Sequence, residues 1–149
     1  MNRVEKSALV EVPLELAYAV VNDIERYPEF VPGCRQVTIV DREEGALRAE
    51  VTVSGTVMGQ TLRESFVTKN TGHPPAELQM QLVRGPFRSL TGTWRFKALG
   101  DLGCRVDITL EYELEGVLMK MLASLVSPMA DKMVDAFVER MMFIHANEV

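Results

Sequence analysis

The chain has 149 residues, of which 47% are hydrophobic and 25% are charged, and its formal net charge is −5. This length fits a single domain, residues 1–149, with a sizeable buried core, and an acidic chain without a basic run argues against a DNA-binding protein. The most apolar stretch, residues 117–129, contains Lys120 and Pro128 and is too short to span a bilayer.

The first predicted elements are a strand and a short helical part. Residues 3–12 have the alternating pattern of an opening or edge strand. Pro13 suits a first helical turn, and apolar residues follow it at helical spacing up to Ile24. The segment YPEFVPGC at residues 27–34 ends this part, because each proline biases the residue before it away from helix. We therefore expect two short helices after the first strand, followed by a stiff apolar bend.

The period of the apolar residues changes to two over residues 35–116. Alternation is clear in four stretches: residues 47–53, 78–82, 93–97 and 105–114. Turn residues separate the stretches at positions 44–45, 71–75, 85–86 and 100–103. The pattern predicts an antiparallel sheet of about seven strands, counting the first, with one wet face and one buried face.

The C-terminal segment, residues 117–147, returns to a helical period. One broad stripe of it is apolar: Leu118, Leu122, Leu125, Met129, Met133, Phe137 and Ile144. Pro128 predicts a kink, or a fresh helix start with Ser127 as its cap. The predicted fold class is α+β, in which a curved antiparallel sheet grips a long C-terminal helix.

Two apolar features have two interpretations each. The bend at residues 27–34 forms a lid over a cavity mouth, or it packs the helical part onto the sheet. Methionines crowd the last helix, namely Met119, Met121, Met129, Met133, Met141 and Met142. Such side chains fill a core, or they form a soft apolar surface for a membrane, a lid or a partner.

Several sequence blocks, in the same order, resemble one known family. The bend at residues 27–34 is followed by ESF at 64–66, LVRGPFRSLTGTWRF at 82–96 and MVDAFVER at 133–140. These blocks resemble the coenzyme Q-binding protein branch of the START-like, polyketide-cyclase-like (SRPBCC) superfamily. Bacterial members of this branch are often called ribosome association toxin RatA. The likeness spans nearly the whole chain.

The resemblance implies a helix-grip fold around an apolar tunnel, with ubiquinone or a similar isoprenoid lipid as ligand and no other cofactor. An isoprene unit contributes about 3–4 kcal/mol, so a quinone ring with two or three units suffices for micromolar binding. We rank a non-catalytic carrier that supports respiration first. A protein that binds the large ribosomal subunit and blocks subunit association comes second, and a cyclase- or hydrolase-like enzyme third.

The expected ligand-binding residues lie in the bend, at inward strand positions and on the last helix. They are Tyr27, Phe30, Val31, Pro32, Val51, Val53, Glu64, Phe66, Met80, Leu82, Trp94, Phe96, Tyr112, Leu125, Met129 and Met133. Glu64 has inward strand parity, so it holds the polar head of a ligand or forms an ion pair with a nearby arginine. Trp94 and Tyr112 carry donors for a quinone carbonyl, with core packing as the alternative.

No catalytic or metal-binding residue is predicted. The strands offer no inward histidine and no Ser-His-Asp order, and neither His73 nor His145 has companions that form a metal site. Cys34 and Cys104 lie far apart, without a CxxC or metal-ligand spacing, which favours buried, reduced thiols.

The expected partners and location follow from the charges and the N-terminus. Arg95, Lys97 and Arg105 share an outer face of the predicted sheet, which contacts phosphates or is simply solvated. The chain begins with a charged, alternating pattern rather than a signal peptide. We expect a bacterial cytoplasmic protein, with peripheral contact to the inner membrane as a further expectation.

Overall fold

A computed structural model describes residues 2–57, 59–116 and 126–148 of the chain. Strand β1 (Asn2–Val10) leads into helix α1 (Leu14–Asn22) and the 3₁₀ helix η1 (Ile24–Glu29). The strands that follow are β2 (Cys34–Glu43), β3 (Ala46–Val57), β4 (Gln60–His73), β5 (Glu77–Arg84), β6 (Phe87–Leu99) and β7 (Gly103–Leu114). Helix α3 (Val126–Ala146) is the last described element.

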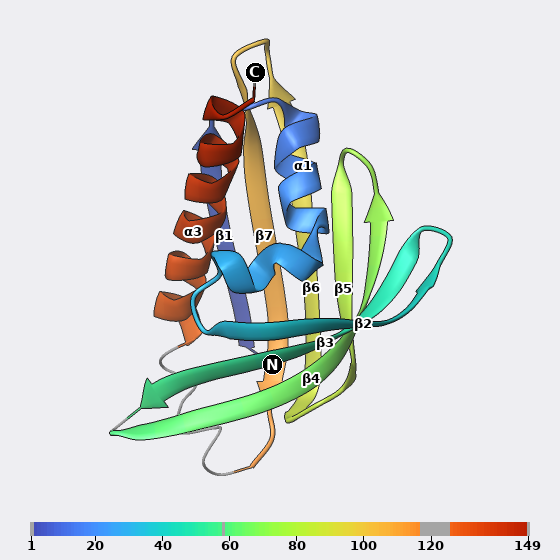
Figure 1. Cartoon of the computed structure of the whole chain (residues 1–149), viewed down its shortest axis with the longest axis vertical. Helices are drawn as coiled ribbons and strands as arrows, with labels where there is room; N and C mark the ends of the chain where they lie inside the picture. The colour runs from blue at the N-terminus through green and yellow to red at the C-terminus, as the bar shows by residue number, and fades with distance from the viewer. Residues whose placement is uncertain (1, 58, 117–125, 149) are drawn as a thin grey trace.

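The seven strands form one antiparallel sheet in the order β1-β7-β6-β5-β4-β3-β2. Strands that follow each other along the chain are neighbours, except that β1 pairs with β7. In Figure 1, β6 and β7 run behind the helices, whereas β2, β3 and β4 sweep across below η1. The curved sheet and the C-terminal helix confirm the predicted helix-grip fold, including the two short helices after the first strand.

Alternation along β6 and β7 places apolar side chains on the concave face. Trp94 lies opposite Ile108, and Phe96 lies opposite Val106 in the register of these strands. All four are buried, whereas Arg95 between them is exposed. The period-two pattern therefore marked the buried face correctly, as expected for a sheet covered on one side.

Helices α1 and α3 cover part of this concave face. From α1, Leu16, Ala17, Val20 and Val21 are buried, as the helical spacing predicts. From α3, the buried residues are Ala130, Val134, Phe137 and Met141. Together with the apolar residues of β6 and β7, most of these side chains form the main core cluster.

Pro128, where a kink or a fresh helix start was predicted, lies within helix α3, which the structure describes from Val126 onward. Ser127 lies inside the helix rather than before it. Leu118, Leu122 and Leu125 of the predicted stripe lie outside the described residues.

The bend ends on a glycine because two geometric conditions meet there. Gly33 has a φ of +79°, a backbone conformation that side chains disfavour. A Cβ atom at this position would also lie 3.0 Å from the carbonyl oxygen of Ser54 in β3. The carbonyl of Gly33 accepts a hydrogen bond from the Ser54 N–H at 2.8 Å. The bend is thereby fastened to β3 just before β2 begins.

Candidate functional site: the concave face and its rim

The aromatic residues of the bend pack against α3. The ring centroids of Tyr27 and Phe30 each lie 5.1 Å from that of Phe137, with nearly perpendicular ring planes. The Tyr27 hydroxyl donates to the carbonyl oxygen of Val21, and burial raises the pKa of Tyr27 above its ordinary value. These contacts support the packing interpretation for both rings. A role at a ligand mouth stays a prediction.

A charged contact reinforces this packing. The Arg140 guanidinium of α3 lies over the Phe30 ring, 5.1 Å from its centroid, and pairs with Glu29 at 2.8 Å. Glu29 also pairs with Arg26 at 3.0 Å. The hydrogen bond from Arg140 and the charge of Arg26 hold the pKa of the Glu29 carboxyl below its usual range. The bend and α3 are therefore joined by both aromatic and ionic contacts.

A second apolar cluster lies on the concave face near the start of α3. The rings of Phe66 and Phe87 meet edge to face, with their centroids 5.8 Å apart. Both rings are half-buried and, with Met80, Leu82 and Leu110, pack against a buried group that includes Tyr112. The structure thus brings together four expected ligand-binding residues: Phe66, Met80, Leu82 and Tyr112. Sequence reasoning missed Phe87 and Leu110.

The other expected strand residues divide between this second cluster and the main core. Val51 lies opposite Phe66 in the β3–β4 register and, like Val53, is half-buried. Trp94 and Phe96 stack with their ring centroids 6.4 Å apart, and Trp94 also contacts Phe137. Trp94 and Phe96 belong to the main core, and this placement supports the core-packing alternative for Trp94.

The remaining expected ligand-binding residues lie in the bend and on the last helix. Val31 and Met133 are half-buried against the main core. Pro32 is exposed, and Met129 is 61% exposed instead of lying on a buried stripe. Leu125 lies outside the described residues.

Glu64 is exposed, and its role in holding the polar head of a ligand stays a prediction. The residue pairs with Val53 of β3, but β4 pairs with β5 only from Val67 onward. Glu64 therefore lies on the part of the β3–β4 hairpin that extends past β5. Inward parity assigned the face correctly, but this part of the face has no β5 neighbour beside it.

Sequence reasoning also missed a buried polar pair on the concave face. Thr68 is 2% exposed and Asn70 is 7% exposed, and both share strand parity with Phe66. The Asn70 Nδ2 donates to Thr68 Oγ1 at 2.9 Å and lies 3.5 Å from the Thr68 carbonyl oxygen. Residues 60–73 show no clear apolar alternation, so no signal in the sequence indicated that this pair is buried.

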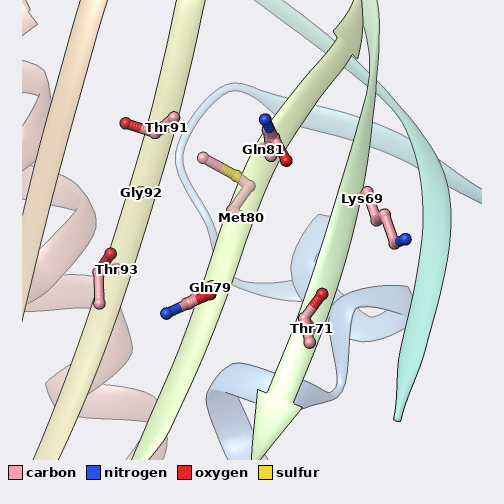
Figure 2. A pocket seen from close by; sticks show the side chains of 8 residues that line it. All are labelled: Lys69, Thr71, Gln79, Met80, Gln81, Thr91, Gly92 and Thr93. Carbon is pink, nitrogen blue, oxygen red and sulfur yellow. The ribbon is translucent and has the colours of Figure 1, made fainter. Parts of the chain in front are cut away.

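The convex face of the sheet is polar. A depression of about 160 Å³ lies there. Figure 2 shows the side chains of β4, β5 and β6 that line it. Its polar lining consists of Lys69, Thr71, Gln79, Gln81, Thr91 and Thr93. Further along this face, Lys97 lies directly opposite Arg105 in the β6–β7 register.

The predicted basic face is partly neutralised. Arg95 lies 3.9 Å from the Glu77 carboxylate, and Arg105 pairs with Asp107 at 3.0 Å. The three basic residues do share the outer face, as predicted, since Arg95 faces Asp107 and Lys97 faces Arg105 across the strands. The face therefore has local positive charge set among acidic neighbours.

The cysteines have no catalytic environment. Cys34 and Cys104 are buried, and burial raises the pKa of each thiol above its ordinary value, which keeps it protonated. No three histidine, cysteine, aspartate or glutamate side chains in the described ranges are placed to hold a metal ion. Within the same ranges, no helix combines the length and apolarity that crossing a membrane requires.

Sequence comparison identifies relatives along most of the chain. The "Ribosome association toxin RatA" of Pseudomonas aeruginosa is 38% identical over 138 residues, which cover 92% of this chain and 93% of the relative. The mitochondrial "Coenzyme Q-binding protein COQ10" of Dictyostelium discoideum is 30% identical over 95 residues, covering 62% of this chain and 45% of that protein. Both sequence relatives carry the names of toxin or binding proteins.

Structure comparison shows the same fold in an enzyme. The Zhui aromatase/cyclase of Streptomyces sp. R1128 superposes with a TM-score of 0.82, covering 95% of this chain and 93% of the enzyme, at 16% identity. Likeness at this identity concerns the fold alone. The sequence profile of the family described as "Polyketide cyclase / dehydrase and lipid transport" matches residues 10–142. The chain therefore belongs to the polyketide cyclase/dehydrase and lipid transport family.

Proposed function

We propose that the protein is a non-catalytic ribosome-association protein of the RatA type, which binds the large ribosomal subunit and blocks its pairing with the small one. The observation that carries this proposal is the 38% identity, over 92% of the chain, to a relative that bears this name. Proteins with the same name in Vibrio cholerae and Escherichia coli are 35% and 34% identical over 94% of the chain.

The chemistry of the buried residues supports a role without catalysis. Burial raises the pKa of Tyr18, Tyr27 and Tyr112, and it does the same for both cysteine thiols. These groups stay protonated at neutral pH, so none of them supplies a ready base or nucleophile. Glu64, the acid considered from the sequence, is exposed to solvent.

The convex face offers one contact surface for ribosomal RNA. Lys97 and Arg105 lie side by side across β6 and β7, and both are exposed. Positive side chains that contact phosphates contribute affinity that falls steeply with salt concentration. This surface is small, so the proposal places a few phosphate contacts there within a larger, mainly polar interface.

Sedimentation with purified large subunits through a sucrose gradient tests the proposal. The wild-type protein is expected to travel with the subunits, and Lys97→Glu and Arg105→Glu are expected to weaken this. Arg3→Glu is the matched control, because Arg3 is similarly exposed but pairs with Glu111, toward the other end of β7 from Arg105. Wild-type protein that stays at the top of the gradient would contradict ribosome association. If the two charge-reversal variants bind normally, the contact with the ribosome lies on another face of the protein.

A second candidate function is the binding of an isoprenoid quinone or similar lipid. It is favoured by the half-buried apolar cluster of Phe66, Met80, Leu82 and Phe87 on the concave face. The relative named as a coenzyme Q-binding protein supports the same ligand class. Apolar surface of this kind binds prenyl chains because each buried CH₂ contributes about 0.8 kcal/mol. Peripheral membrane contact, as lipid exchange requires, stays a prediction.

Extraction of the purified protein with organic solvent, followed by mass spectrometry, tests this second function. Protein produced in a quinone-making host is expected to release an isoprenoid quinone, and Met80→Lys is expected to release less. Met142→Lys is the matched control, since Met142 is 54% exposed and lies outside the cluster. If the extracts contain no isoprenoid and the protein clearly binds the large subunit, ribosome association is the one proposed function that remains.

A further inference from the structure

A pocket with both polar and apolar lining lies between the end of α1 and the β2–β3 hairpin, apart from the apolar cluster of the concave face. Its volume is about 260 Å³. Its lining includes Tyr18 and Asn22 of α1, Leu47 of β3, and Asn70 and Gly72 of β4. A second depression of about 200 Å³ shares Asn22, Arg42 and Leu47 with it, so the two lie next to each other beside α1.

The inner end of this pocket is formed around a glycine. A Cβ atom at Gly72 would lie 2.2 Å from the Tyr18 hydroxyl and 3.7 Å from Asn22 Oδ1. Only a residue without a side chain therefore leaves room for the Tyr18 hydroxyl at this point. Tyr18 itself is 7% exposed, and its ring meets Phe96 of the main core edge to face. The hydroxyl is thus held in place by a ring that is fixed in the core.

The orientation of the Asn70 side chain is set by Thr68. The Thr68 carbonyl accepts hydrogen bonds but donates none, so the Asn70 amide group that faces it must be the nitrogen. The amide oxygen, Oδ1, consequently points away from Thr68. Asn70 is 7% exposed and lines the pocket, which makes Oδ1 an acceptor available at the pocket wall.

Both polar groups lack a protein partner among the described residues. Neither the Tyr18 hydroxyl nor Asn70 Oδ1 takes part in a hydrogen bond within these residues. Neither atom is fully enclosed by the protein, so each can be reached from the pocket. A molecule bound there can complete both hydrogen bonds in place of water.

The charges at the rim point to an uncharged ligand. Arg42 pairs with Glu25 at 2.5 Å, and Lys69 pairs with Glu43 at 3.2 Å. The charges nearest the pocket thus already neutralise each other. Leu47, Ala46 and Pro74 also line the pocket and form an apolar wall.

We propose that this pocket binds a small, neutral ring compound that carries hydroxyl groups, a phenol in chemical class. One ligand hydroxyl donates to Asn70 Oδ1, and a ligand oxygen accepts from the Tyr18 hydroxyl. The face of the ring lies against the apolar wall at Leu47. The site is independent of both proposed functions, because it shares no residue with the Lys97–Arg105 surface or with the Phe66 cluster.

Resorcinol is the probe, and 1,3-dimethoxybenzene is its matched control, since the methyl ethers keep the ring but remove both donors. Titration of the ¹⁵N-labelled protein with resorcinol is expected to shift the amide signals of Asn70 and Gly72. The dimethoxy compound is expected to cause no such shift. Equal shifts with both compounds, or shifts confined to other parts of the chain, would overturn the proposal.

Two variants make the test specific. Tyr18→Phe removes the hydroxyl and is expected to weaken resorcinol binding by roughly 3- to 10-fold, the effect of one hydrogen bond. Tyr112→Phe removes another largely buried hydroxyl, in the second cluster, and is expected to leave the affinity unchanged. Thermal unfolding of both variants verifies that they are folded. Unchanged resorcinol affinity in folded Tyr18→Phe would also overturn the proposal.

Discussion

Phe30 and Arg140 form a direct link between the bend and the C-terminal helix. The guanidinium carbon of Arg140 lies 5.1 Å from the centroid of the Phe30 ring. A cation over an aromatic face contributes about 0.5–1 kcal/mol at an exposed site and more when it is shielded from water. Because Phe30 also packs on Phe137, the bend behaves as part of the main core. Three predictions follow from the core and its rim.

Replacement of Phe137 should be strongly destabilising. Phe137 is 1% exposed and contacts Tyr27, Phe30 and Trp94 through its ring. Phe137→Ala leaves a cavity among these rings and is expected to lower the free energy of unfolding by about 3–5 kcal/mol. Urea denaturation followed by circular dichroism measures the change.

Phe143→Ala is the control for this replacement, since Phe143 is on the same helix but is 59% exposed. Its expected effect is within about 0.5–1 kcal/mol, which allows for its contact with Arg140. Equal losses in the two variants would show that the aromatic cluster around Phe137 does not hold α3 in place.

Glu29 should make stability depend on pH in the acid range. Arg140 holds the pKa of the folded carboxyl below its ordinary value of 4.5, so the folded state favours the charged form. The stabilisation is therefore complete above that ordinary value and is lost as the pH falls through the folded pKa. Between about pH 6 and about pH 3, the urea midpoint of the wild type should fall more than that of Glu29→Gln.

Glu44→Gln is the control for the pH series, because Glu44 is an exposed residue of the β2–β3 turn. Its midpoint should follow the wild-type curve throughout. If Glu29→Gln shows the same acid loss as the wild type, the ion pair with Arg140 contributes nothing to stability in solution.

Gly72 and Tyr18 should be coupled energetically. A Cβ atom at Gly72 would lie 2.2 Å from the Tyr18 hydroxyl but 3.6 Å from the ring carbon Cζ that bears it. Gly72→Ala is therefore expected to destabilise the protein by about 1–3 kcal/mol, the usual range for overpacking. Adding Tyr18→Phe removes the clashing oxygen and should restore most of the loss.

A double-mutant cycle measured by urea denaturation tests this coupling. The reference is Tyr18→Phe alone, so that only the added methyl group differs within each pair. A loss from Gly72→Ala that is just as large in the Tyr18→Phe protein would mean that the hydroxyl is not the atom that excludes the methyl group.

The regular elements were predictable because their patterns are periodic. Alternation over residues 105–114 identified β7 and its buried face, and the prolines near Phe30 located the bend. Periodicity assigns a residue to a face but does not say how far the neighbouring strand extends. For that reason the sequence left the exposure of Glu64 open, and only the strand register shows that β5 does not reach beside it.

The polar features needed the folded chain. Thr68 and Asn70 are polar residues of a stretch without clear alternation, and only the structure shows that they bond to each other and that Asn70 lines a pocket. Tyr18 occupies an ordinary buried position on α1, and nothing in the sequence brings it to Gly72, more than fifty positions later. Contacts of this kind depend on tertiary packing, which local patterns do not encode.

Reassociation of ribosomal subunits is the most direct test of the proposed function. Purified large subunits are incubated with the protein, small subunits and Mg²⁺ are added, and the mixture is resolved on a sucrose gradient. If the protein blocks the pairing of the subunits, paired ribosomes should decrease and free subunits should increase as more protein is added. An unchanged proportion of paired ribosomes, at protein concentrations well above that of the subunits, would contradict it.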